Sequence, residues 1–258
     1  MRAADLPSPF AAPSKPETIG PRMSTDSIPD DVVKFLPRQL QVDEIARALQ
    51  EDIIFGRLAP GARLVEDQLM ARFAATRHFT RQALYELERL GIAVREKNKG
   101  VSVRILTPSE VRQIYEVREL LQRQAVLRIP LPAPSALIAE LEVLHEQYVR
   151  FLDDRDFGAM HECNDAFHMA IVSACGNHYL VESIKHYMRL SLPVRATKTV
   201  DVEHARKSAA DHHMMIQALK GTDSWALAQL CVDHLQSAKN DYLRDREEAG
   251  GVVRRAGA

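Results

Sequence analysis

Apolar residues recur at three- and four-residue spacing in three consecutive segments between residues 42 and 90, and this periodicity predicts three short helices. The first segment carries Val42, Ile45, Ala46, Leu49 and Ile53. The second carries Leu69 and Phe73, and the third carries Ala83, Leu84, Leu87 and Leu90. Gly56 and the turn at Pro60-Gly61 separate the first two segments, and Thr76 can cap the third helix because its hydroxyl accepts a backbone N–H.

After Gly91 the pattern changes to alternation, which predicts two short strands. The alternating positions are Val94 and Glu96, followed by Val101, Val103 and Ile105. The stretch Lys97-Asn98-Lys99-Gly100 lies between the two strands and gives the hairpin a basic tip. Three helices followed by such a hairpin predict a winged helix-turn-helix domain over residues 38–106, and DNA binding is its first function hypothesis.

From Pro108 onward every segment has helical periodicity, and no stretch alternates strongly enough to predict a strand. The expected helices cover residues 108–129, Ser135–Asp153, Asp156–Ala174, Tyr179–Lys198 with a kink at Pro193, Val202–Leu219 and Asp223–Glu247. The fold class is therefore mainly α, with an all-α bundle of about six helices over residues 107–248. Residues 1–37 hold seven of the 13 prolines and are expected to be a disordered leader, and residues 249–258 a flexible tail.

The amino end of the third helix is where a recognition helix meets base edges in the major groove. The candidate DNA-contacting residues on this helix are Arg77, His78, Phe79 and Arg81, and those of the hairpin are Lys97, Lys99 and Gly100. Residues 38–106 hold twelve Lys and Arg against nine Asp and Glu, whereas the whole chain has a net charge of −1. The positive excess therefore lies where DNA contact is expected. A winged domain that binds only protein, with a merely solvated tip, is the alternative.

Several stretches of this domain are similar to the amino-terminal domain of GntR-family bacterial transcription regulators. The matching stretches are Gly56–Leu64, Leu69–Phe73, Thr76-Arg77, Arg81–Leu84 and Leu87–Gly91. The resemblance runs through Gly100 and implies a winged helix-turn-helix that binds operator DNA as one half of a homodimer. His78 and Phe79 stand where the family commonly has a small hydroxylated residue and a proline, so the operator sequence does not carry over.

Within the bundle, one set of polar residues has the spacing of a metal site. Asn164 and His168 are four residues apart and share a helix face, and His212 and His234 lie on two later helices. Imidazoles suit borderline divalent metals, and helical bundles build such sites from facing helices. Because the chain has ten histidines, this spacing alone also arises readily by chance.

The same region resembles the ligand-binding domain of the FadR-type branch of GntR regulators. The matching positions are Asn164–His168, Ala174–Asn177, His212, Ile216, Ala218, Asp223 and His234. The resemblance implies that Asn164, His168, His212 and His234 hold a divalent metal ion, zinc in the first place, with nickel or manganese as alternatives. Asn164 replaces a frequent Asp, and a shift of register by one residue would put His213 in place of His212.

A metal held by neutral ligands keeps its positive charge and open positions, which an anion can fill. A small organic acid is therefore the expected effector. Arg118 lies where the family often carries Arg and could pair bidentately with its carboxylate, and Arg189 is a second candidate. An ordinary salt bridge is the alternative role of either arginine.

Two other classes of protein compete with an effector-controlled regulator. Three histidines on a metal also describe a metal-dependent enzyme of small organic acids, but no HExxH motif, Gly-rich phosphate loop or nucleophile elbow is present. A regulator whose metal is purely structural is the third class. The expected protein is a DNA-binding regulator and not an enzyme. Repression is the commoner behaviour in the family, so we expect a repressor.

Composition limits the location of the protein and the role of its cysteines. The chain has no run of 18 apolar residues and no basic amino terminus followed by an apolar stretch, so we expect a cytoplasmic protein without membrane contact. The cysteines, Cys163, Cys175 and Cys231, are three in number, far apart and within apolar patterns. They are expected to be reduced core thiols.

Overall fold

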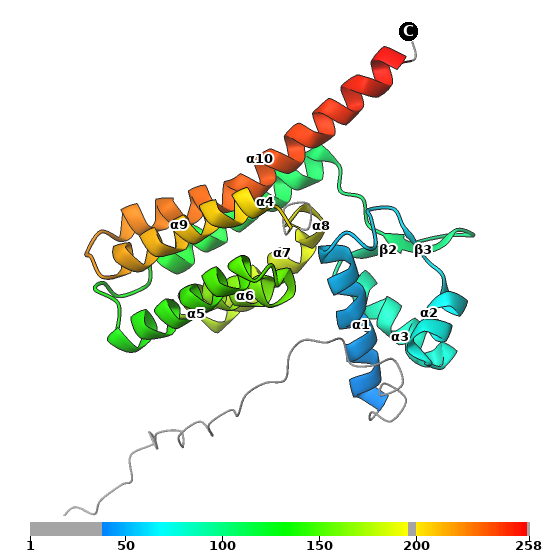
Figure 1. Cartoon of the computed structure of the whole chain (residues 1–258), viewed down its shortest axis with the longest axis horizontal. Helices are drawn as coiled ribbons and strands as arrows, with labels where there is room; N and C mark the ends of the chain where they lie inside the picture. Colours follow the sequence, from blue (N-terminus) through cyan, green and yellow to red (C-terminus); the bar gives the residue numbers. More distant parts are fainter. Residues whose placement is uncertain (1–37, 196–199, 257–258) are drawn as a thin grey trace, which may run out of the picture.

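The computed structural model describes residues 38–195 and 200–256. The leader expected at residues 1–37 and the end of the helix expected at Tyr179–Lys198 therefore lie outside the described residues. The mainly α fold is confirmed, with a winged amino-terminal part and a helical carboxyl-terminal part (Figure 1). None of the described helices is both long enough and apolar enough to cross a membrane.

The winged domain contains three helices and a small sheet. The helices are α1 (Arg38–Ile54), α2 (Glu66–Phe73) and α3 (Arg77–Arg89), and the strands are β1 (Arg63–Leu64), β2 (Ala93–Glu96) and β3 (Gly100–Val103). The strands form an antiparallel sheet in the order β1-β3-β2, with Val94 opposite Ser102 and Arg63 opposite the same Ser102 on the other side. Strand β1 was not predicted, because two residues are too few to show alternation.

Residues at the two ends of α3 explain where this helix begins and ends. Thr76 caps the helix, and its hydroxyl oxygen accepts a hydrogen bond from the backbone N–H of Phe79 at 3.4 Å. Gly91 ends it with a φ of +72°, a left-handed conformation that glycine adopts without strain. Between these ends, the inward face packs Ala83, Leu84 and Leu87 against α1 in the core of the domain.

The helical domain has seven helices among the described residues. They are α4 (Pro108–Val126), α5 (Ser135–Asp153), α6 (Phe157–Ser173), α7 (His178–Leu190), α8 (Leu192–Arg195), α9 (Val202–Leu219) and α10 (Ser224–Ala256). Helix α10 packs along α4 and α9, and α5 packs against α6 and α9 (Figure 1). Polar side chains that point inward from α4, α6, α9 and α10 therefore meet in the middle of the domain.

Three of the expected helices end elsewhere in the structure, and the first of them, expected at residues 108–129, ends at Val126. The helix expected at Tyr179–Lys198 is broken at Ser191, two residues before Pro193, because proline lacks an N–H and its ring clashes with the carbonyl four residues earlier. The segment after the break is the short helix α8. Helix α10 continues to Ala256, beyond the end expected near residue 248, so part of the expected tail is helical.

Candidate metal centre and DNA-binding surface

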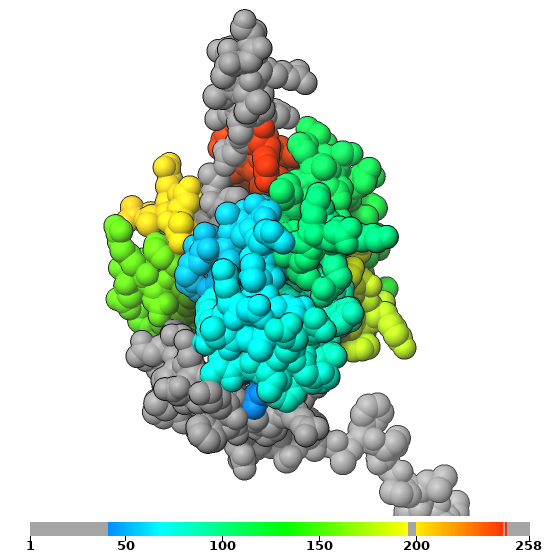
Figure 2. Space-filling model, turned by 90° about the vertical axis from the view of Figure 1, so that its right-hand side faces the viewer, coloured from blue at the N-terminus to red at the C-terminus, as the bar shows by residue number. Residues whose placement is uncertain are grey.

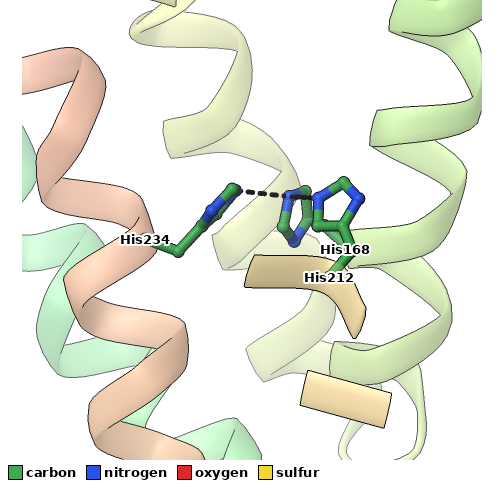
Figure 3. A group of neighbouring side chains, drawn as sticks. All are labelled: His168, His212 and His234. Atoms are coloured by element: carbon green, nitrogen blue, oxygen red, sulfur yellow. Dashed lines mark hydrogen bonds between the residues drawn. The ribbon is translucent and has the colours of Figure 1, made fainter. Parts of the chain in front are cut away.

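Three histidines from three helices meet in the helical domain. His168 projects from α6, His212 from α9 and His234 from α10, and their rings point toward one another (Figure 3). The Nε2 atom of His168 lies 3.3 Å from Nε2 of His212 and 3.1 Å from Nε2 of His234. Tetrahedral zinc with Zn–N bonds of about 2.0–2.1 Å requires N···N separations of about 3.4 Å. Two of the separations are therefore close to those between ligands of one small cation, and the ligand atoms of all three rings lie within 4.8 Å of one another.

The surroundings of the rings fix their positions. His212 is fully buried, with Phe167 stacked on it at 4.2 Å between ring centroids and Tyr148 edge-on at 5.1 Å. Nδ1 of His234 lies 2.9 Å from a carboxylate oxygen of Asp211, on α9. A metal-binding histidine usually has such a hydrogen-bond acceptor for its second nitrogen, because this contact orients the ring.

Burial also sets the protonation of the group. Removal from water, with nearby His234, lowers the pKa of His168 well below its ordinary value. Removal from water, with nearby His168, does the same to the pKa of His212. Neutral imidazole is the form that binds a metal, so the folded chain keeps these two rings ready for coordination at neutral pH.

The other two residues considered for this site have different positions. Asn164 lies one turn before His168 and lines the same cavity, and its Nδ2 donates to Asp165 Oδ1 at 3.3 Å. His213 is exposed, and its ring lies 6.0 Å from that of His145, so it is not part of the three-histidine group. The structure thus places His212 rather than His213 beside His168.

A cavity of about 100 Å³ opens next to the histidines. Its polar lining includes Tyr115, Arg118, His161, Asn164 and Arg195 together with the edges of His168 and His234. Two guanidinium groups therefore share a small space with the imidazoles of His168 and His234, whereas His212 does not line the cavity. This arrangement favours an anion, because a carboxylate can accept hydrogen bonds from a guanidinium and also bind a metal ion.

Arg118 is held in this cavity by two contacts. Its Nη1 donates to the Ser191 hydroxyl oxygen at 2.9 Å, and its guanidinium lies 4.9 Å from the ring centroid of Tyr115. Removal from water lowers the pKa of Arg118 to about 10, so the group keeps its positive charge at neutral pH. A buried and charged Arg118 can bind an anion in the cavity.

The second arginine of the cavity is Arg195, which the sequence did not single out. It projects from α8 and forms an ion pair with Asp165 on α6. Arg189, the residue considered instead, is exposed and does not line the cavity. The reason is helical geometry: the buried face of α7 is made by Val181, Ile184 and Met188, and the next residue points about 100° away.

The amino end of α3 presents its polar side chains to solvent, as a recognition helix requires. Arg77, His78 and Arg81 are all exposed. Arg77 pairs with Asp67 at 2.8 Å, and Arg81 binds both carboxylate oxygens of Glu66 at 3.0 and 2.9 Å. Exposed ion pairs of this kind are weak, so both guanidinium groups can exchange their carboxylate partners for base edges.

Phe79 does not share this exposure, so its expected position at the exposed end of α3 is wrong, while its contact with DNA stays a prediction. It is half-buried and packs against the core of the winged domain. The physical reason is that Phe79 lies four residues before Ala83, on the inward stripe of α3.

The tip of the wing lies on the same side as α3. Lys97 and Lys99 are exposed, Lys99 pairs with Glu96 at 2.7 Å, and Gly100 has a φ of +83° in the turn. A hollow between α2, α3 and the wing is lined by Arg63, Arg77, Arg95, Lys99 and Gly100, among others. Arg63 and Arg95 are basic residues that the sequence did not assign to this surface, and the acidic Glu66 and Asp67 line the same hollow. Figure 2 looks onto this end, where the winged domain in blue and cyan fills the middle of the face.

Two family models match the chain. Residues 41–103 match the model of the bacterial regulatory proteins, gntR family, and residues 113–237 match the FCD domain. The first covers most of α1 and continues to the end of β3, and the second covers most of the helical domain, including the three histidines.

The chain is also similar to named transcription regulators over most of their length. It is 26% identical to the Nta operon transcriptional regulator of Aminobacter aminovorans over 190 residues, which are 71% of this chain and 86% of that protein. It is 22% identical to the HTH-type transcriptional repressor RspR of Escherichia coli over 82% of this chain and 93% of that protein. The gluconate operon transcriptional repressor of Bacillus licheniformis is 26% identical, with coverage of 74% and 80%.

Solved structures show the same fold. A GntR transcriptional regulator from Rhodococcus sp. RHA1 superposes with a TM-score of 0.66 at 22% identity, over 79% of this chain and 98% of that one. McbR/YncC of E. coli superposes with a TM-score of 0.69 at 20% identity, over 82% and 99%. At this level of identity the likeness concerns the arrangement of the helices and the wing.

Proposed function

The chain belongs to the GntR family of bacterial regulatory proteins and carries an FCD domain, and on this premise we propose that a small carboxylate controls its affinity for operator DNA. The carboxylate binds in the cavity beside a divalent metal ion. The chain is a DNA-binding transcription regulator and not an enzyme, because its domains and its relatives are those of regulators.

One observation carries the ligand proposal: His168 and His234, whose Nε2 atoms lie 3.1 Å apart, line a cavity together with two guanidinium groups, and Nε2 of His212 lies 3.3 Å from that of His168. The ligand set proposed for the metal is His168, His212 and His234, with Asn164 as a neutral fourth ligand. None of these ligands carries a negative charge. The metal, when bound, supplies an uncompensated positive charge and an open position for a carboxylate oxygen.

The choice of metal follows from the donor atoms. Imidazole nitrogens suit zinc, nickel and other borderline ions better than calcium or magnesium, which prefer oxygen. Because the observed N···N separations match a small tetrahedral ion, we propose zinc, with nickel or manganese as alternatives.

Arg118 and Arg195 would orient the carboxylate. The Nη1 group of Arg118 is held at Ser191, and Arg195 is held at Asp165, so both guanidinium groups are fixed before the acid arrives. A preorganised pair of this kind loses little side-chain entropy on binding. The rest of the cavity wall includes the apolar side chains of Met188 and Leu235.

On the DNA side, we propose a homodimeric repressor. A single winged domain covers one half-site, so a twofold pair is needed for a pseudo-palindromic operator. Arg77, His78 and Arg81 would read bases, while Lys97, Lys99 and the Gly100 backbone would contact the phosphates. Two of the relatives named above are repressors, which supports this sign of regulation.

A purely structural metal is the competing proposal, and the full burial of His212 favours it. The two are separated by calorimetric titration of small carboxylic acids into zinc-loaded protein, zinc-free protein and an Arg118→Ala variant. The effector proposal requires an acid that binds the zinc-loaded protein and binds the other two at least tenfold more weakly, about 1.4 kcal/mol. Equal binding to all three samples would leave the metal with a structural role.

A further inference from the structure

The segment that joins α7 to α8, residues 190–195, contacts both the cavity and the winged domain. Helix α8 lies between the helical domain and α1 (Figure 1). We call residues 190–195 the α7–α8 junction. Its neighbours on the two sides differ in kind: polar groups of the cavity on one side, and the apolar core of the winged domain on the other.

On the cavity side, the junction contributes Arg195 and binds Arg118. The hydroxyl of Ser191 is fully buried, accepts from Arg118 at 2.9 Å and donates to the Met188 carbonyl at 3.0 Å. Four residues later, Arg195 pairs with Asp165, the neighbour of Asn164 on α6. An anion that accepts a hydrogen bond from the guanidinium of Arg118 or Arg195 therefore changes the hydrogen bonds of the junction itself.

On the other side, the junction is part of the winged domain's core. Leu192 is 5% exposed and belongs to the same apolar cluster as the inward residues of α1 and α3. Leu190 touches the end of the recognition helix, since a Cβ atom added to Gly91 would lie only 2.6 Å from Leu190 Cδ1. Close packing of this kind transmits small displacements, because packed groups have no room to absorb them.

The junction also packs against the residues that connect the two domains. Val194 is fully buried in a cluster with Leu106 and Tyr115, and the Tyr242 hydroxyl donates to the Leu106 carbonyl at 3.1 Å. Leu106 is the residue before the Thr107 cap of α4. The covalent connection between the domains and the junction thus lie in one cluster, and the two domains are held at several points rather than by the linker alone.

From these contacts we infer that the α7–α8 junction conveys the state of the cavity to the recognition helix, with Leu192 as the residue that couples the two domains. The inference rests on the proposed ligand role of the cavity and adds the route by which that ligand acts on DNA affinity. A change at Ser191 or Arg195 shifts Leu190 and Leu192, and these move α3 relative to the helical domain. In a dimer, such a movement alters the spacing of the two recognition helices.

Hydrogen exchange of the full-length protein tests this route without an identified effector. Two perturbations act on the cavity: Zn²⁺ added to chelator-treated protein, and the Arg118→Ala substitution, which removes the donor to Ser191. Each should change exchange of the amides at the end of α3 and in β2 by about tenfold, within the usual range of coupling between sites. In a Leu192→Ala background the change should fall below about twofold.

Leu69→Ala is the matched control, because Leu69 is equally buried in the winged core but lies on α2. This variant should weaken the core and still transmit both perturbations. The inference is overturned if Leu192→Ala transmits them as wild type does, or if both perturbations change exchange only in the helical domain. If Zn²⁺ does not bind, the metal part of the proposed function fails, and the Arg118→Ala comparison still decides the role of the junction.

Discussion

The Nδ1 atom of His234 lies 2.9 Å from a carboxylate oxygen of Asp211, which joins α10 to α9 at the residue before His212. When the Nδ1–H of a histidine donates to a carboxylate, Nε2 becomes the atom with the available lone pair. Nε2 of His234 is the atom that faces His168. Asp211 therefore positions one proposed metal ligand and stands next to another.

This relationship gives the first prediction. Asp211→Asn should lower the affinity for zinc by about 10- to 100-fold, because the amide keeps the shape but loses the charge that supports the ring. Asp233→Asn is the control: Asp233 precedes His234 in the sequence, but it is exposed and accepts from Gln229 at 2.7 Å. Competition with a chromophoric chelator measures the zinc affinity of both variants. Equal affinity of the two variants would mean that Asp211 does not support the metal site.

The second prediction separates two neighbouring histidines. His212→Ala should abolish the binding of one zinc ion per chain, whereas His213→Ala should retain it, because only His212 lies in the three-histidine group. Elemental analysis after gel filtration gives the stoichiometry, and circular dichroism shows whether the His212 variant is folded. Loss of zinc from a folded His213→Ala variant would show that the register of the site is different.

The third prediction concerns DNA. Arg81→Ala should weaken binding to a selected operator by about 1–3 kcal/mol and relax the sequence preference, because the exposed guanidinium can reach base edges. Lys99→Ala should instead weaken binding to all duplexes and reduce the salt slope by about one. Gel-shift titrations at several salt concentrations distinguish the two. A uniform loss for Arg81→Ala would assign it to the phosphates.

The fourth prediction is a pH dependence at the start of α4. The Thr107 backbone N–H and hydroxyl, together with Arg104, lower the pKa of Glu110 to about 2 in the capping box. The unfolded chain, with a pKa near 4.5, therefore binds more protons between pH 4.5 and 2. Stability from this carboxylate is fully present above pH 4.5 and is lost as the pH falls toward 2.

Denaturant titrations of wild type and Glu110→Gln check this sign. The difference in their free energies of unfolding should be constant above pH 5 and should shrink steadily between pH 4.5 and 3. Glu140→Gln on α5, where the glutamate is exposed, is the control for the loss of one carboxylate. A difference that grows on acidification would mean that the Glu110 carboxylate opposes folding.

Local signals in the sequence explain which helices could be predicted. Helices α5 and α9 have the bounds expected, because Pro134 precedes the first, and Asp201 caps the second. The break at Ser191 was misplaced as a kink at Pro193, since the sequence shows where a proline lies but not where the helix before it ends. Strand β1 depends on pairing with β3, which is a tertiary contact.

The site was predictable only where helical spacing or family resemblance applies. The shared helix face of Asn164 and His168 could be predicted from their spacing along one helix. That His212 and His234 lie beside this pair depends on how three helices pack, which the spacing does not show. Arg195 was missed because its direction is set by the break before α8, which ends the periodicity of α7. Its ion pair with Asp165 is likewise invisible in the sequence.

The central claim is that one carboxylate ligand and the operator act on the same equilibrium. Its most direct measurement is calorimetric titration of the tightest-binding acid into zinc-loaded protein, with and without operator DNA. We predict that operator changes the affinity for the acid by about 5- to 150-fold, that the acid changes operator affinity by the same factor, and that Arg118→Ala removes the effect. Equal affinity for the acid with and without operator would contradict the account.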